Sequence, residues 1–259
     1  MWFDGQTLVL DAAQAACVAA PAAGLPRALE RWRRSGWALV APLSIAVVIG
    51  GIALAPGTAD VLTWVALIGV PLGCAIGLGW AMRGARPPLA VLAAPLLAVA
   101  WASQHSRGGQ LAALALVALC NVAIGRLLAG GAPLGLLKLG IVVMAIVDSI
   151  LVFSNQLQHP NAILEAASPG LGLPRLQSVA YGGATMGFGD LFAAAVVGAI
   201  FAAERRPPLR AAAALLVVAF LWDQLFLHFD TLPATVPPAL VLVGVEMWRR
   251  TGAQRQRAS

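Results

Sequence analysis

Charged residues are scarce in this chain. They make up 11% of its 259 residues, whereas hydrophobic residues make up 60% and the mean hydropathy is +0.84. A soluble domain of this length has about twice that charged share, because its surface faces water. The composition therefore excludes an ordinary cytosolic enzyme, a disordered tail and a nucleic-acid-binding module. It predicts a membrane protein.

Residues that hold metals or form disulfides are also few. They are Cys17, Cys74, Cys120, His105, His159 and His228. The cysteines are odd in number and lack CxxC spacing, which argues against a disulfide framework, and the histidines share no ligand spacing. We therefore expect no metal and no cofactor.

Long apolar runs dominate the rest of the sequence. A membrane-spanning helix needs about 20 mainly apolar residues, and eight runs are clearly of this kind. A ninth, weaker run at Leu8–Leu25 contains Asp11, Gln14 and Pro21, so it is either a span or an interfacial helix. The prediction is an all-α polytopic membrane protein with eight or nine helices. The eight clear runs are Trp37–Ala55, Val61–Met82, Pro88–Ala102, Gln110–Ala129, Leu136–Gln156, Val179–Ala203, Arg210–His228 and Leu232–Trp248.

The basic residues predict the orientation of these spans, because Lys and Arg accumulate in cytoplasmic loops. They gather in alternate loops and in the C-terminal tail, which predicts a cytoplasmic C-terminus. Arg outnumbers Lys, of which Lys138 is the one example, and with the abundant Ala this indicates GC-rich coding and hence a prokaryotic cytoplasmic membrane. The cytoplasmic set is Arg27, Arg31, Arg33, Arg34, Arg83, Arg86, Arg126, Lys138, Arg205, Arg206, Arg210, Arg249, Arg250, Arg255 and Arg257, with Arg107 and Arg175 opposite.

Three aspartates interrupt the apolar runs: Asp148, Asp190 and Asp223. An ionisable group inside a membrane is costly and marks a candidate functional site. Asp148 lies ten residues after Lys138, about 15 Å along a helix and close to the membrane midplane. Asp190 reaches a similar depth on the next, antiparallel run. Two such carboxyls share a proton and divide into an acid and a base, as in aspartic proteases. For Asp223 we favour a structural role.

Two further motifs accompany this pair. Asp190 ends the string Gly187-Phe188-Gly189-Asp190, in which the glycines let a helix start or bend near the carboxylate. Pro237-Pro238-Ala239-Leu240 interrupts the last run at about the depth of the aspartates. Unwound backbone at that depth is tolerated where it lines a protein cavity.

The order of these motifs resembles the presenilin and signal peptide peptidase family of intramembrane aspartyl proteases. That family has a YD motif, then GxGD, then PAL, and here Val147-Asp148, Gly187–Asp190 and Pro238–Leu240 follow in that order. The run Asp148–Phe153 is similar to the DxxxVF run of signal peptide peptidases. The resemblance covers Leu136–Trp248. It departs at Val147, which replaces the family Tyr and removes a hydroxyl, and at Val241, where many members have Pro.

The resemblance implies a bundle in which an aspartate pair activates water without metal or covalent intermediate. Substrates would be transmembrane or signal-peptide helices in the bilayer, with no nucleic acid and no obligate partner. Residues 1–36 would form an N-terminal segment, 37–129 an N-terminal bundle, 136–248 the catalytic half and 249–259 a basic tail. The implied catalytic residues are Asp148 and Asp190, and the implied substrate-binding residues are Gly187, Phe188, Gly189, Pro238, Ala239 and Leu240.

Two other functions stay open at this point. A proton- or cation-coupled transporter would use the same aspartates along a polar path. A prepilin peptidase-like protease also uses GxGD, but it predicts a site near the cytoplasmic face and usually a Lys soon after the motif, where this chain has Leu191-Phe192-Ala193.

Overall fold

A computed structural model of the chain describes residues 5–23, 34–55, 57–156, 158–170, 172–229 and 231–258. It is mostly helical, at 78%. Arg27, Arg31 and Arg33 of the basic N-terminal cluster lie outside the described residues, as does the end of the run Leu8–Leu25.

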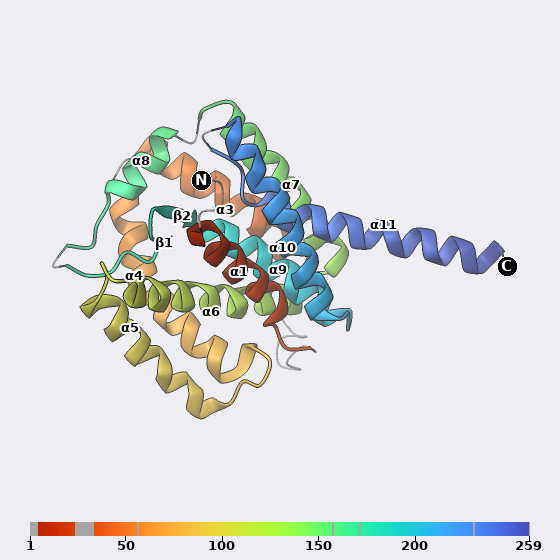
Figure 1. Ribbon diagram of the computed structural model, residues 1–259, viewed down its shortest axis with the longest axis horizontal. Helices are drawn as coiled ribbons and strands as arrows, with labels where there is room; N and C mark the ends of the chain where they lie inside the picture. Colours follow the sequence, from red (N-terminus) through yellow and green to blue (C-terminus); the bar gives the residue numbers. More distant parts are fainter. Residues whose placement is uncertain are drawn as a thin grey trace.

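The described elements follow one another in a helical bundle with one small hairpin (Figure 1). In chain order they are α1 (Gly5–Ala19), η1 (Ser35–Leu39), α3 (Val40–Leu54), α4 (Thr58–Ile76), η2 (Gly77–Ala81), η3 (Pro87–Leu92), α5 (Ala93–Ala102), α6 (Arg107–Gly131), α7 (Leu134–Phe153), α8 (Gln158–Ala166), β1 (Ser178–Tyr181), β2 (Ala184–Gly187), α9 (Phe188–Ala203), α10 (Pro208–Asp223), η4 (Gln224–Leu227) and α11 (Val236–Ala258).

Five helices among the described residues are long and apolar enough to cross a membrane. Two shorter apolar helices, Pro87–Ala102 and Phe188–Ala203, accompany them. The prediction of a helical membrane protein is therefore confirmed, whereas the count of eight or nine spans is not. The five are Ser35–Leu54, Thr58–Ala81, Arg107–Gly131, Leu134–Phe153 and Pro208–Leu227.

The expected helix over Val179–Ala203 was wrong in its first third. Residues 178–187 instead form the antiparallel hairpin β1–β2, in which Tyr181 pairs with Ala184 across the turn Gly182-Gly183. Gly182 has a φ of 63°, a left-handed conformation that glycine adopts without strain. The helix begins only at Phe188, beside the glycines that the sequence marked as a helix start.

The last helix also begins later than the apolar run predicted. Residues 231–235 are non-helical, and α11 starts at Val236. Pro237 and Pro238 therefore lie in its first turn, where the missing backbone N–H groups cost no helical hydrogen bond. Figure 1 shows the far end of α11 extending well beyond the rest of the bundle.

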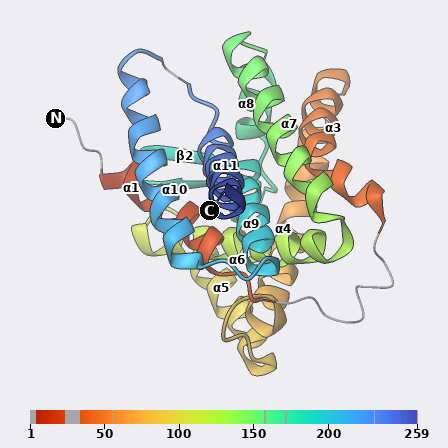
Figure 2. The same cartoon turned by 90° about the vertical axis from the view of Figure 1, so that its right-hand side faces the viewer.

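Helix α9 is the centre of the fold. Every residue from Leu191 to Ala202 is buried, and Figure 2 shows α9 between the α1–α10 side and the α7–α3 side. Glycines let two neighbours approach closely. A Cβ on Gly125 of α6 would lie 2.6 Å from the Ala195 carbonyl oxygen, and one on Gly198 of α9 would lie 2.5 Å from that of Val18 in α1. Small residues thus permit backbone contact, as is common between membrane helices.

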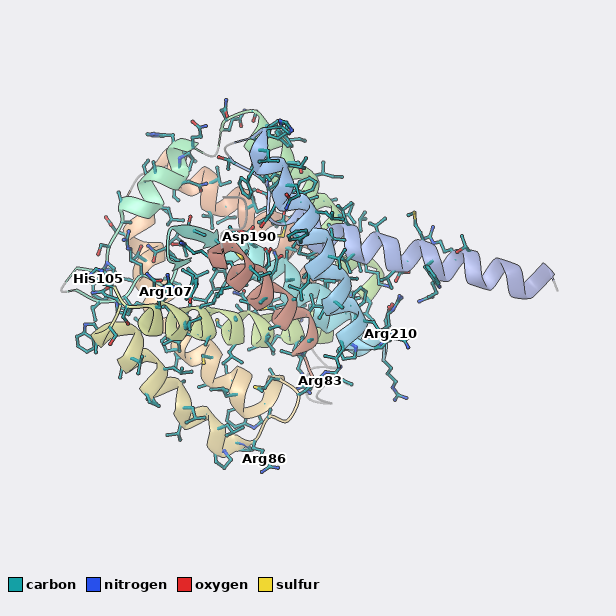
Figure 3. All side chains as sticks on the ribbon, in the orientation of Figure 1. Arg83, Arg86, His105, Arg107, Asp190 and Arg210 are labelled. Carbon is teal, nitrogen blue, oxygen red and sulfur yellow. The ribbon has the colours of Figure 1, made fainter. Side chains whose placement is uncertain are left out.

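The outer surface of the bundle is apolar. Val47, Leu54, Ile68, Leu72 and Ile150 are each more than 60% exposed. A surface of this kind faces lipid, and together with the long apolar helices it indicates a membrane protein. In Figure 3, Arg83 and Arg210 lie toward one end of the bundle and His105 and Arg107 at the opposite end.

Candidate active site

Asp148 lies in the second half of α7, and its side chain is half-buried. The Thr235 hydroxyl donates a hydrogen bond to Asp148 Oδ2 at 2.5 Å. Thr235 is 2% exposed and belongs to the non-helical segment just before α11. Val147, the residue before this aspartate, lacks the hydroxyl that the Tyr of the YD motif would supply. In the folded chain a hydroxyl does reach Asp148, but it comes from another part of the sequence.

Asp190 lies in the first turn of α9, the third residue of the helix. Its Oδ2 accepts a hydrogen bond from the Gly187 backbone N–H at 2.9 Å, as the acidic residue of a capping box does. The positive end of the helix dipole also favours negative charge at this place. Gly187 has no side chain, so its backbone can approach the carboxylate closely. The position labelled in Figure 3 is in the interior of the bundle.

The fold brings the two aspartates to one cavity. Both line a cavity of about 1650 Å³. One turn before Asp148, the Met144 side chain lies 3.9 Å from where a Cβ on Gly189 would be, so α7 and the start of α9 are in contact. Asp148 thus comes from the second half of α7 and Asp190 from the first turn of α9.

The other residues predicted for the site divide into two groups. Gly187, Phe188 and Gly189 line the cavity. Pro238, Ala239 and Leu240 do not belong to the described lining; Ala239 is buried in the bundle and Leu240 is 48% exposed. The wall near α11 is made by Pro237 of its first turn and by the preceding segment, with Leu232, Pro233, Ala234 and Thr235.

Sequence reasoning missed the contribution of α1. This helix packs against α9 and α10 inside the bundle, and its Thr7, Asp11 and Gln14 line the same cavity. The spacing of these three residues is i, i+4, i+7, which places them on one helix face. That pattern was visible in the sequence, but nothing in it indicated which cavity the face would reach.

Asp223 lies in the same cavity, which the sequence did not reveal. It is the last residue of α10, and both Asp223 and Asp11 of α1 line the cavity. The cavity lining therefore includes four carboxyl groups, those of Asp11, Asp148, Asp190 and Asp223.

A cluster of ion pairs connects α7, the residues that follow α9, and α11. Lys138 at the start of α7 pairs with Glu204, which follows α9, and lies 2.7 Å from Glu246 of α11. Arg206 contacts the same two glutamates, at 2.5 Å each. All four side chains are less than a quarter exposed. The cluster thus connects α7, which contains Asp148, with the end of α9, which contains Asp190. It also connects both to α11, which follows the segment 231–235.

A comparison of the chain with protein-family models, curated proteins and solved structures finds no match. The described residues contain no group of three or more His, Cys, Asp or Glu side chains able to hold a metal ion. They do contain two carboxyls that line one cavity, one hydrogen-bonded to a hydroxyl and the other to a backbone N–H. Carboxyl groups placed in this way are suited to acid–base catalysis.

Proposed function

We propose that the chain is an intramembrane aspartyl protease of the kind its motifs resemble, hydrolysing peptide bonds in transmembrane or signal-peptide helices. One observation carries the proposal. Asp148 and Asp190 come from different helices and line the same cavity. A pair of carboxyls in a shared cavity is the minimal equipment of an aspartic protease.

In this mechanism the ionised aspartate takes a proton from water as the water oxygen attacks the scissile carbonyl carbon. The protonated aspartate donates its proton to the carbonyl oxygen, which gives a tetrahedral diol. The aspartate that took the proton from water gives it to the leaving nitrogen as the C–N bond breaks. The other aspartate takes a proton back from a diol hydroxyl, so the pair returns to its starting state. Neither a metal nor a covalent intermediate takes part. Thr235 and Gly187, each bonded to one carboxyl oxygen, orient the two carboxylates.

Strand β2 supports a way to hold an unwound substrate. In a two-residue hairpin the residues flanking the turn exchange hydrogen bonds, and pairs alternate from there. Tyr181 and Ala184 flank this turn, so the next residue, Thr185, directs its N–H and C=O away from β1. Thr185 is exposed and lines the cavity. An extended substrate segment adds to this edge by β-augmentation.

The position of β2 in the chain brings a substrate paired with its edge close to the two aspartates. The strand leads directly into α9, so a peptide paired along it runs beside Asp190. Residues 233–235 form a second wall of the same cavity and carry the hydroxyl bonded to Asp148. In the predicted orientation the C-terminus is cytoplasmic, and the substrate enters from the bilayer.

The test is cleavage of a single-span substrate in liposomes by the wild type, Asp148→Asn and Asp190→Asn. Asp60→Asn is the matched control, because Asp60 is exposed at the start of α4 and lies away from the cavity. We expect the first two variants to be inactive and the control to cleave like the wild type. A peptide isostere with a hydroxyl at the attacked carbon should block cleavage. Equal cleavage by all four proteins would refute the proposal.

A proton- or cation-coupled transporter is the second candidate, because two further carboxyls, those of Asp11 and Asp223, line the same cavity. Four carboxyls along one cavity are typical of a path for protons or cations. Such a transporter would move protons across a liposome membrane in the absence of peptide. It would not bind the hydroxyl isostere, so the two measurements separate the candidates.

A further inference from the structure

Gln14 is a buried polar side chain with an unusual pair of partners. It lies in α1, is 1% exposed and is surrounded by apolar residues of that helix such as Leu10, Ala15 and Val18. A buried amide is tolerated where its hydrogen-bonding groups are satisfied. The identity of its partners therefore shows what the side chain does in the fold.

The side-chain nitrogen of Gln14 donates to two backbone carbonyls from different parts of the chain. Nε2 lies 3.3 Å from the Asp190 carbonyl oxygen and 3.0 Å from the Ala234 carbonyl oxygen. A primary amide nitrogen has two hydrogens, so one side chain serves both acceptors.

These two carbonyls belong to the two halves of the site. Asp190 is the catalytic candidate in α9, and Ala234 immediately precedes Thr235, whose hydroxyl is bonded to Asp148. The hydrogen bonds thus connect Asp190 to Gln14, Gln14 to the segment 234–235, and that segment to Asp148. Neither α7 nor α9 supplies this connection itself.

We propose that Gln14 is a positioning residue that sets the placement of Asp148 relative to Asp190, and that α1 is therefore part of the active site. The expected effect on cleavage rests on the proposed protease function, whereas the expected effect on the segment 231–240 does not. The chemistry needs Gln at this place. Met has the same length but no donor, Asn is one methylene too short to reach both carbonyls, and ionised Glu would repel them.

The chain offers a matched control in Asn121 of α6. It is 0% exposed, and its Nδ2 donates to the Val117 carbonyl oxygen one turn earlier in the same helix, at 3.0 Å. Asn121 is not among the described residues that line the cavity. Asn121→Leu thus removes an equally buried amide without touching the connection between the aspartates.

The experiment is hydrogen–deuterium exchange on the full chain in detergent, followed by peptide mass spectrometry. We expect Gln14→Met to speed exchange in the segment 231–240 by about tenfold, as the loss of a hydrogen bond to a buried carbonyl implies. Asn121→Leu should leave this segment unchanged. Because Gln14 is so deeply buried, Gln14→Asn is measured as well; it keeps an amide, is too short to bridge, and should loosen the same segment.

Cleavage of a single-span substrate gives the functional readout. We expect kcat of the Gln14 variants to fall by about 100-fold, the effect of a small misplacement of reacting groups, with KM unchanged because the β2 edge is intact. Unchanged exchange at 231–240 in both Gln14 variants would overturn the proposal, and so would equal loosening by Asn121→Leu. Faster exchange without cleavage by the wild type would uphold the positioning role and refute the protease function.

Discussion

Replacing Thr235 by Val tests the hydrogen bond that orients Asp148. Valine has nearly the same shape as threonine but lacks the hydroxyl, so Thr235→Val deletes the 2.5 Å contact to Asp148 Oδ2 with little change in volume. Thr235 is only 2% exposed, so a side chain of nearly the same shape keeps the packing of the segment before α11. The carboxylate is left in place without its partner.

The magnitude follows from the strength of this bond. A hydrogen bond to a charged group contributes about 1.5–3 kcal/mol. If the bond acts in the transition state, its loss lowers kcat by about 10- to 100-fold, since each 1.4 kcal/mol corresponds to about one factor of ten. Thr235→Ser keeps the hydroxyl and should recover most of the activity. KM should stay close to its wild-type value in both variants.

The assay is cleavage of a single-span peptide in liposomes, with kcat and KM measured for wild type, Thr235→Val and Thr235→Ser. Circular dichroism and size-exclusion elution confirm that each variant is folded. The reasoning is wrong if Thr235→Val cleaves within about twofold of the wild type, because the bond would then contribute less than the range for charged partners. Equal losses in Val and Ser variants would assign the effect to shape instead of the hydroxyl.

Three further predictions concern the strand, the helix contacts and the ion cluster. Thr185→Pro should abolish cleavage by removing the outward N–H of β2, whereas Thr185→Ala, which keeps it, should stay active in the same assay. Gly125→Val should destabilise the bundle in a thermal unfolding scan, because its side chain meets the Ala195 carbonyl, whereas Gly50→Val, with nothing within 4 Å, should not. Lys138→Met should lower the unfolding free energy by about 1–2 kcal/mol, a loss between those for exposed and for buried ion pairs. The measurement is unfolding in denaturant, and a midpoint equal to that of the wild type would contradict this prediction.

The aspartates of the site could be predicted from the sequence because they are chemically conspicuous. A carboxyl in an apolar run stands out wherever it occurs, and the glycines before Asp190 indicated a helix start that α9 has. Thr235 and Gln14 could not be found in this way. Their partners lie 87, 176 and 220 residues away in the chain, and a single hydroxyl or amide in an apolar segment gives no indication of what it will meet.

The hairpin was missed for a related physical reason. Hydropathy measures whether a segment avoids water, and residues 178–187 contain no charged residue, so they were counted with the apolar helix that follows them. Whether such a segment is helical or paired depends on turn geometry at Gly182 and on neighbours that accept its polar groups. Gly182 N–H donates to Gln110 Oε1 at 2.8 Å and Gly183 N–H to Gln6, so α6 and α1 stabilise the turn.

The sequence by itself determined that this chain is a helical membrane protein and marked Asp148 and Asp190 as its candidate site. Both results depend on local properties, namely the cost of exposing apolar residues to water and of placing carboxyls among them. Only the tertiary structure decided that α1 lies inside the bundle, that residues 231–235 and not the PAL residues line the cavity, and that Gln14 and Thr235 connect the two aspartates. Those facts depend on which helices pack together, and contacts between residues far apart in the chain are formed only when the whole bundle is assembled.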